Sequence, residues 1–240
     1  MASPCVVCGN QDFAFLARDR GYAWEECRAC AFVRIAAAFT LAETAGGKDD
    51  AAMGRSYIDG YRAKFASKMA RSRRRAARLR RWSRGDDFLD IGSNFGFMVE
   101  AAEHAGFRAV GVEVNHTLVE AARRQFPGRT FVAGLLEEQQ FGARRFDVVY
   151  CSEVIEHTAD PRLFLKQVSS VMQPGGLLYL TTPHIREYRK RDFADMGAPD
   201  HKLYFNSTNL RRLLLECGFA IVREEFTFFR GIKLCAWRAG

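Results

Sequence analysis

From about residue 85 onward, hydrophobic and polar positions alternate in two regular patterns. Short apolar runs of strand length occupy residues 86–92, 108–114, 129–134, 146–152, 175–183, 219–226 and 232–238. Between them, apolar residues recur at helical spacing over 95–106, 116–126, a segment opened by Asp160-Pro161, and 207–218 with Ser207 as the expected cap. This alternation predicts an α/β fold with a mostly parallel seven-stranded sheet, covered by helices on both faces. The last strand is expected to be antiparallel, at an edge or an inserted position.

A strongly basic stretch precedes the first of these strands. From Arg62 to Arg84 there are eleven Lys or Arg residues and no acid, whereas the whole chain has a net charge of +8. Apolar residues recur within the stretch at helical spacing, at Phe65, Met69, Ala76 and Leu79. We therefore expect an amphipathic helix with a cationic outer face.

The composition divides the chain into three regions. Gly46-Gly47 and Asp49-Asp50 are typical of loops, so a linker is expected over 40–54. The regions are a cysteine-bearing unit, a linker with the basic helix, and the α/β domain, at 1–39, 40–84 and 85–240.

Length and composition allow one catalytic domain and a small appendage, since the chain has 240 residues of which 48% are hydrophobic. The opening MASPCVVCGN lacks the basic segment and apolar run of a signal peptide, and no apolar stretch is long enough to span a membrane. We expect a soluble, cytoplasmic protein without membrane contacts.

Four of the seven cysteines form two CxxC pairs, separated by eighteen residues. This spacing is typical of a zinc ribbon, in which two tight turns bring four thiolates into a tetrahedron and leave no open coordination position. We therefore predict a structural Zn²⁺ site with the ligands Cys5, Cys8, Cys27 and Cys30. The other cysteines stand singly among apolar residues, which indicates buried thiols.

The first predicted strand of the α/β domain ends in the sequence Asp90-Ile-Gly-Ser-Asn-Phe-Gly96. A turn from strand into helix needs residues that tolerate positive φ and let a ligand approach the backbone, which explains Gly92 and Gly96. Glu113 follows at the end of the next strand, where a carboxylate can accept hydrogen bonds from both hydroxyls of a ribose. Together these features predict a nucleoside-containing cofactor.

In this order of motifs the chain resembles the class I, Rossmann-like S-adenosylmethionine-dependent methyltransferases, from about Tyr57 onward. The motifs of that family occur here in the same order. They are a glycine-rich turn at 90–96, a strand-end acid at Glu113, FDVV at 146–149, E-V-x-E-H at 153–157, PGG at 174–176 and GF at 218–219. The absence of a phosphate-binding G-x-G-x-x-G favours a sulfonium cofactor over a dinucleotide. Asp90 fits a sulfonium, which requires carboxylates or carbonyls nearby.

The resemblance implies where the cofactor lies. Gly92 and Asn94 would follow its methionine part, Glu113 would hold the ribose, Val114 would pack on the adenine, and Leu136 would lie at the adenine edge. Asn94 replaces the middle glycine of the family turn, and asparagine tolerates the left-handed region. Leu135 stands where many relatives have an adenine-binding Asp, so the adenine amine would be bound by backbone or by Glu137.

Methyl transfer needs alignment of the acceptor and, for many acceptors, a base. His201, preceded by Asp200, stands in a stretch similar to the E-H-x-x-x-[YF] segment of small-molecule methyltransferases, including zinc-containing sugar C-methyltransferases, in which the matching histidine is the base. A loop histidine with a structural role is the alternative. His157, in the E-V-x-E-H motif, is a second candidate whose alternative is an architectural role, and Tyr57 and Tyr61 either cover the site or only pack.

Three functional hypotheses follow from these features. The preferred one is an enzyme that methylates oxygen or carbon of a small anionic metabolite, such as a sugar nucleotide, a glycan or a natural-product intermediate, with His201 as base. An RNA methyltransferase that uses the Arg-rich helix and the zinc unit is the first alternative. A non-catalytic, zinc-dependent binding module is the second.

Overall fold

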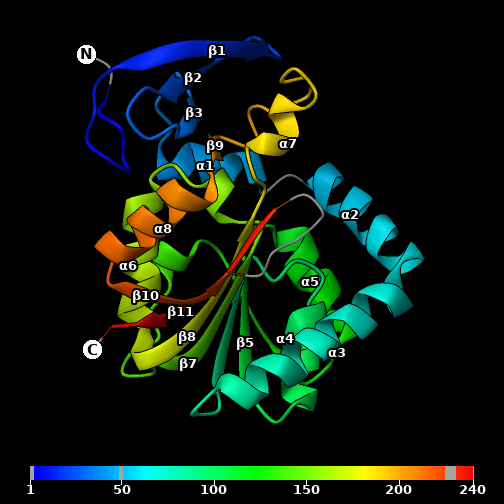
Figure 1. Ribbon diagram of the computed structural model, residues 1–240. Helices are drawn as coiled ribbons and strands as arrows, with labels where there is room; N and C mark the ends of the chain where they lie inside the picture. Colours follow the sequence, from blue (N-terminus) through cyan, green and yellow to red (C-terminus); the bar gives the residue numbers. More distant parts are fainter. Residues whose placement is uncertain (1–2, 49–50, 225–230, 240) are drawn as a thin grey trace.

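The computed structural model describes residues 3–48, 51–224 and 231–239, which form two sheets flanked by helices (Figure 1). The smaller sheet has the strand order β1-β2-β3-β9, and all its neighbouring strands are antiparallel. Its strands are β1 (Phe13–Asp19), β2 (Tyr22–Cys27), β3 (Val33–Ile35) and β9 (Leu203–Tyr204). The cysteine-bearing N-terminal unit therefore completes its sheet with a strand from the second half of the chain.

The larger sheet has seven strands in the order β10-β11-β8-β7-β4-β5-β6. The strands are β4 (Asp87–Ile91), β5 (Arg108–Glu113), β6 (Thr130–Ala133), β7 (Phe146–Ser152), β8 (Met172–Thr182), β10 (Phe219–Glu224) and β11 (Ile232–Arg238). Strands β6, β5, β4, β7 and β8 are parallel, whereas β11 is antiparallel to both β8 and β10. The predicted α/β class and the inserted antiparallel last strand are confirmed.

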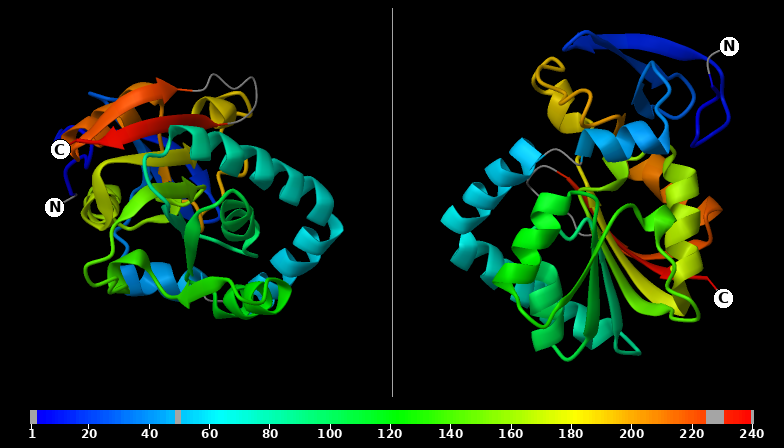
Figure 2. Two further views of the ribbon diagram at one scale, coloured as in Figure 1. Left: turned by 90° about the horizontal axis from the view of Figure 1, so that it is seen from below. Right: turned by 180° about the vertical axis from the view of Figure 1, so that it is seen from behind.

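Helices cover both faces of the larger sheet (Figures 1 and 2). Those on or near it are α3 (Phe65–Trp82), α4 (Phe97–His104), α5 (His116–Gln125), α6 (Pro161–Val171) and α8 (Ser207–Glu216). One hydrophobic cluster joins α6 and α8 to one face of the sheet, and a second joins α3, α4 and α5 to the other. Within the described residues, no helix is long and apolar enough to cross a membrane.

The prediction of a linker over 40–54 is wrong, because helices α1 (Leu41–Lys48) and α2 (Ala51–Ala63) occupy most of it. Thr40 and Glu43 form a capping box: the Thr40 hydroxyl accepts from the Glu43 amide at 3.1 Å, and the Glu43 carboxylate accepts from the Thr40 amide at 2.7 Å. These contacts satisfy amides that a helix start leaves open. Asp49 and Asp50 lie outside the described residues.

The expected cap at Ser207 is also wrong by one residue. Asn206 caps α8, since its side chain accepts from the Asn209 amide at 2.8 Å, and the Asn209 side chain accepts in return from the Asn206 amide at 3.0 Å. Asn206 has the extended backbone of a cap residue, and Ser207 is the first helical residue. The expected cap at Asp160 is confirmed.

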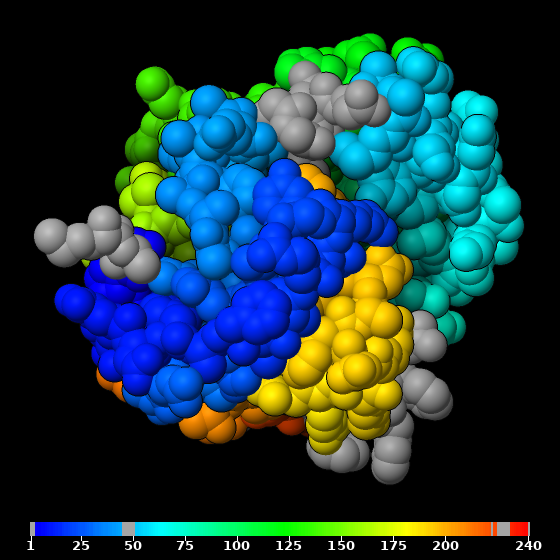
Figure 3. Space-filling model, turned by 90° about the horizontal axis from the view of Figure 1, so that it is seen from above, coloured from blue at the N-terminus to red at the C-terminus, as the bar shows by residue number. Residues whose placement is uncertain are grey.

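The N-terminal unit is attached to the larger domain at several points. Val33 and Arg34 of β3 pair with β9, and the side-chain amide of Asn209 donates to the Cys30 carbonyl at 3.3 Å. On the outer surface the blue N-terminal strands lie beside the yellow segment that contains the short helix α7 (Arg186–Arg189), as Figure 3 shows. Arg20 and Asp195 form an ion pair of 2.7 Å across this junction.

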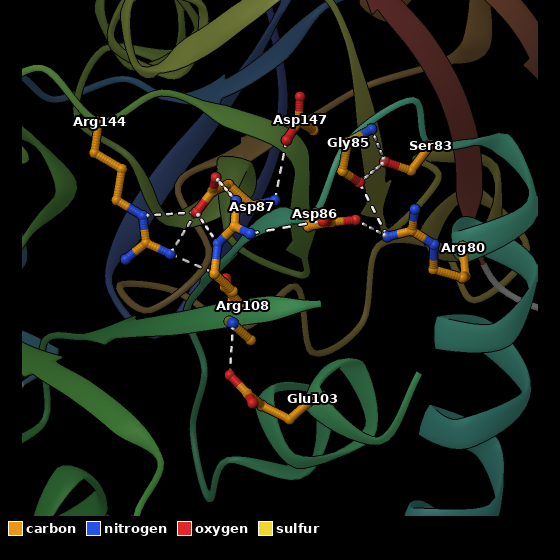
Figure 4. Close-up of polar contacts among 10 residues, drawn as sticks. Arg80, Ser83, Gly85, Asp86, Asp87, Glu103, Arg108, Arg144 and Asp147 are labelled. Atoms are coloured by element: carbon orange, nitrogen blue, oxygen red, sulfur yellow. Dashed lines mark hydrogen bonds and ion pairs between the residues drawn. The ribbon is translucent and has the colours of Figure 1, made fainter. Parts of the chain in front are cut away.

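A network of ion pairs lies at the amino ends of β4 and β5 (Figure 4). Asp87 accepts from Arg108 at 2.5 Å and from Arg144 at 2.7 Å, while Asp86 pairs with Arg80 at 2.9 Å. Partial burial alone would raise the pKa of Asp87, but the two guanidinium groups hold it below its usual range. The network thus joins β4, β5 and the loop before β7.

We expect Asp87→Asn to lower the free energy of unfolding by about 1–2 kcal/mol at pH 7. The pKa of Asp87 is lower in the folded state than in the unfolded state. Its contribution to the free energy of unfolding is therefore complete above the unfolded pKa of about 3.9 and is lost as pH falls through the folded-state pKa. The difference between variant and wild type in urea titrations should therefore shrink below about pH 4. Exposed Glu120→Gln is the control, with less than about 0.5 kcal/mol expected. A difference that stayed constant between pH 7 and pH 3 would contradict this assignment.

Candidate active site

A cavity of about 670 Å³ lies at the carboxyl ends of β4, β5, β7 and β8. Open parallel sheets bind ligands at this edge, where strand ends and the following turns converge. Nine of the residues predicted from the sequence line the cavity: Asp90, Gly92, Asn94, Glu113, Val114, Leu136, His157, Asp200 and His201. Helices α1, α2 and α3 close its outer side, through residues such as Thr44, Tyr57 and Arg71.

The turn after β4 holds its shape through Asn94. This residue has φ of +50°, in the left-handed region, and its side-chain amide donates to the Gly92 carbonyl at 2.8 Å. Gly96 does not line the cavity. It precedes α4 with φ of +87°, and a Cβ atom there would lie 2.6 Å from the Phe131 ring, so packing and backbone conformation require the glycine.

Glu113 is held rigidly at the end of β5 and is only 7% exposed. One of its carboxylate oxygens accepts from the Asn94 amide at 2.9 Å, and the other accepts from the Asn115 amide at 2.9 Å. Each carboxylate oxygen can accept a further hydrogen bond. Glu113 can therefore bind a vicinal diol while the two amides fix its orientation.

Two further groups shape the ends of this part of the cavity. Asp90 is fully buried, and burial together with the nearby Glu113 raises its pKa, so a cationic ligand would be favoured beside it. At the opposite end, Glu137 lines the cavity, and burial raises its pKa. The Leu135 amide already donates to Glu138 at 2.9 Å, and the Leu135 carbonyl accepts from the Gln139 side chain at 2.8 Å. This arrangement favours Glu137 over the Leu135 backbone as the polar contact for an adenine amine.

The structure brings the two candidate histidines together. The ring centroids of His157 and His201 are 4.7 Å apart in an edge-to-face arrangement. Nδ1 of His157 donates to the Asp200 carbonyl at 2.8 Å, so its proton is on that nitrogen. Ligand atoms of Glu156, His157 and His201 lie within 4.8 Å of one another, an arrangement that could also hold a divalent cation.

Tyr204, which sequence reasoning did not single out, sets the orientation of His201. The Tyr204 hydroxyl donates to the Met196 carbonyl in a short hydrogen bond, so it accepts from Nδ1 of His201 at 2.8 Å. Burial raises the pKa of Tyr204, which keeps the hydroxyl protonated. His201 therefore carries its proton on Nδ1 and its lone pair on Nε2, as a general base requires.

Glu153 is a second residue in an unusual backbone conformation at this edge. Its φ is +58°, and its carboxylate accepts from the Thr181 hydroxyl at 2.8 Å, which in turn accepts from Ser152 at 2.8 Å. Burial raises the pKa of Glu153. Left-handed backbone at a residue with a side chain is characteristic of functional sites, and here it directs a carboxyl group into the cavity.

Two aromatic residues of α2 cover the turn after β4. Tyr57 and Tyr61 are stacked, with centroids 6.0 Å apart, and both line the cavity. The Tyr61 hydroxyl donates to the Asn94 side chain at 3.0 Å. The interpretation of these residues as covering the site is therefore favoured over packing alone.

The basic helix is only partly as predicted. Met69, Ala76 and Leu79 are buried, as expected. The expected cationic outer face is present, with Arg73 and Arg74 exposed, but Lys68, Arg71 and Arg75 also line the cavity, which the pattern does not predict. Helices α2 and α5 continue the wall on which α3 lies, so one side of α3 borders the cavity, although Arg71 remains exposed.

The four predicted zinc ligands lie together in the N-terminal unit. Their sulfur atoms are all within 4.8 Å of one another, with Cys5 and Cys30 at 3.6 Å and Cys8 and Cys27 at 3.5 Å. A tetrahedral zinc site with bonds of 2.3 Å would separate its sulfurs by ~3.8 Å. The donor set and spacing therefore fit Zn²⁺.

Comparison with known proteins identifies relatives of this chain and of its fold. A family model described as a methyltransferase domain matches residues 61–224. The ubiquinone biosynthesis O-methyltransferase of Coxiella burnetii (strain Dugway 5J108-111) is 29% identical over 119 residues, which cover 48% of this chain and 50% of that protein. The chain thus spans about half the length of the curated relatives it matches.

Solved structures show the same fold. An S-adenosylmethionine-dependent methyltransferase from Clostridium acetobutylicum superimposes with a TM-score of 0.61 at 12% identity, over 78% of this chain and 99% of that one. Magnesium protoporphyrin IX methyltransferase from Synechocystis, solved with bound S-adenosylhomocysteine, gives a TM-score of 0.54 at 18% identity, over 70% of this chain and 83% of that one.

Proposed function

Because the chain belongs to the S-adenosylmethionine-dependent methyltransferases, we propose that it transfers a methyl group to oxygen or carbon of a small anionic metabolite, with His201 as the general base. The observation that carries this proposal is the single cavity that Glu113, Asn94 and His201 share. Its volume of about 670 Å³ lies in the range of small-molecule sites. The family assignment sets aside the alternative of a non-catalytic binding module.

Oxygen is the acceptor that the relatives favour. The curated relatives are named as O-methyltransferases of ubiquinone biosynthesis, and they match about half of this chain. A hydroxyl acceptor has a proton to lose, and a histidine with its lone pair on Nε2 can receive it. This agreement between the names of the relatives and the His201 tautomer supports an oxygen acceptor.

Each group at the cavity has a distinct proposed role. The cofactor supplies an activated methyl group for an in-line displacement. Glu113 binds the ribose diol, and Asn94 and Gly92 follow the methionine part. Asp90 lies beside them, and because burial raises its pKa, a cationic ligand would stabilise its ionised form. His201 takes the acceptor proton at Nε2, and Tyr204 holds the other ring nitrogen.

We also infer that Cys5, Cys8, Cys27 and Cys30 hold a structural Zn²⁺. In the absence of metal, burial raises the pKa of Cys5 and Cys30, whereas at Cys27 burial is outweighed by the backbone amides of Cys30 and Ala29, which lower its pKa to about 7. Amides directed at sulfur are suited to thiolate ligands. Four protein ligands leave no position for substrate, so zinc would stabilise the N-terminal unit and take no part in the transfer.

Glu113→Gln should weaken binding of S-adenosylhomocysteine by about 10- to 100-fold in calorimetry. A glutamine side chain has only one acceptor oxygen, so it can accept from the Asn94 amide or from the Asn115 amide but not from both. Its NH2 group would then face the other amide, donor against donor. Glu120→Gln, exposed on α5, is the control and should bind as wild type does. Equal affinity of Glu113→Gln and wild type would contradict the cofactor site.

The proposed reaction is tested by incubating the protein with methyl-labelled cofactor and a metabolite extract. We expect a labelled small molecule, detected by mass spectrometry, that the Glu113→Gln variant forms much more slowly. Label that is recovered only in material that ribonuclease degrades would instead show that the methyl acceptor is RNA. Tight cofactor binding with no labelled product from either source would contradict the proposed acceptor class.

A further inference from the structure

One wall of the cavity is cationic. Lys68, Arg71 and Arg75 line it from successive turns of α3, and Lys233 lines it from β11. Positions that are three, four and seven residues apart lie on one face of a helix. Lys233 pairs across the sheet with Thr181, so it lies beside the carboxyl end of β8. The cations of α3 and β11 thus border the same cavity.

No acid on α3 compensates these cations, and the carboxyl of the cavity on which Arg75 and Lys233 act is that of Glu153, where their charges oppose the rise in pKa that burial causes. Burial lowers the pKa of half-buried Lys68, and the nearby charges of Arg71, Lys64 and Arg75 lower it further. Within residues 3–48, 51–224 and 231–239, neither Lys68 nor Arg71 forms an ion pair. Like charges that converge at a cavity wall raise the local concentration of anions there.

The cavity has opposite charges at its two sides. Asp90 and Glu113 lie at the ends of β4 and β5, where a cationic cofactor would bind. The cationic wall belongs to α3 and β11. Arg75 lies nearest the acidic side, because its guanidinium donates to the Tyr150 hydroxyl at 2.7 Å and Tyr150 pairs with Asp90 across the sheet. Arg71 and Lys68 lie one and two turns closer to the N-terminus of α3, with Lys68 Nζ 4.5 Å from the centroid of the Tyr61 ring, and they are the candidates for a second ligand.

We propose that Lys68 and Arg71, assisted by Lys233, bind a phosphate or diphosphate group of the methyl acceptor. This inference rests on the proposed function and names its substrate class as phosphorylated small molecules. A carboxylate carries one charge, whereas a phosphate ester or diphosphate carries about two and offers several acceptor oxygens to several donors. Binding of that group would fix the acceptor between the cofactor and His201.

The experiment measures binding of inorganic pyrophosphate by calorimetry, with the protein saturated by S-adenosylhomocysteine. Saturation occupies the site of the cofactor carboxylate, so only a second anion site remains. We expect wild type to bind pyrophosphate, and the Lys68→Ala/Arg71→Ala variant to bind it at least about tenfold more weakly. Arg73→Ala/Arg74→Ala is the matched control, because it removes two exposed cations of the same helix that do not line the cavity.

The outcomes are distinguishable. Unchanged affinity for S-adenosylhomocysteine in both double variants, with pyrophosphate binding lost only in Lys68→Ala/Arg71→Ala, supports the subsite. Absence of pyrophosphate binding to the saturated wild type overturns it, as does equal weakening by the control variant. Weaker binding of S-adenosylhomocysteine by Lys68→Ala/Arg71→Ala would show that these cations hold the cofactor carboxylate, which also overturns it. Failure of wild type to bind S-adenosylhomocysteine at all would instead contradict the proposed function itself.

Discussion

His201→Ala is expected to lower kcat by about 10²- to 10⁴-fold, the range typical of a general base, while affinity for S-adenosylhomocysteine stays unchanged. The reason is that His201 is fixed by Tyr204 with its lone pair on Nε2, whereas Glu113 and Asn94 lie on other elements of the cavity. Turnover is measured with the labelled product, and binding by calorimetry. His104→Ala, on the half-exposed end of α4, is the control.

Tyr204→Phe refines this test. It keeps the ring that packs against Trp24, with centroids 5.4 Å apart, and removes the hydroxyl that accepts from Nδ1 of His201 and donates to the Met196 carbonyl. A positioning role predicts a smaller fall in kcat than His201→Ala, with KM unchanged. Full turnover by His201→Ala would remove the proposed base. Loss of wild-type activity on chelation, restored by Mg²⁺ or Mn²⁺, would instead make Glu156, His157 and His201 a cation site.

Loss of the metal site should have an equally large effect on a different part of the molecule. We expect Cys27→Ser to abolish stoichiometric zinc binding and to unfold the N-terminal unit, because structural zinc contributes ~10–16 kcal/mol in small zinc units. Strand β3 pairs with β9, which begins two residues after His201, and Asn209 donates to the Cys30 carbonyl. Turnover should therefore fall with the loss of zinc, although no ligand of the metal touches the cavity.

Hydrogen exchange separates this effect from global unfolding. In Cys27→Ser, amides of residues 13–35 and 201–206 should exchange fast, whereas those of β4 and β5 should stay protected and S-adenosylhomocysteine should still bind. Cys217→Ala, which removes a buried thiol outside the cluster, should retain one zinc ion per chain by elemental analysis. Wild-type protection in a metal-free Cys27→Ser protein would contradict a structural zinc site.

The sequence was most informative where one local pattern determines an element. The central strands β4, β5 and β7 follow from apolar runs that are buried on both faces, and the turn at 90–96 follows from backbone requirements. Helix α1 is not predicted because its two glycines indicate a loop. The capping box at Thr40 and Glu43 is nevertheless a local sequence signal for the start of a helix. That helix could therefore have been predicted.

Other features depend on partners that are remote in sequence. The basic helix was expected to face solvent on its polar side, because a helical pattern does not show which surfaces surround it. The contact between His201 and Tyr204 joins a loop residue to the two-residue strand β9, and a spacing of three residues there does not show where the side chains point. Pairing of β3 with β9 joins segments that no periodicity connects.

The shared strand β9 also constrains the order in which the protein can mature on the ribosome. Strands β1, β2 and β3 emerge early, but Leu203 and Tyr204, which complete their sheet, are synthesised only after β4 to β8. Until then the nascent N-terminal unit exposes the edge of β3 as an unpaired strand. A metal ion bound early by the four cysteines would hold that edge in a defined shape until its late partner arrives.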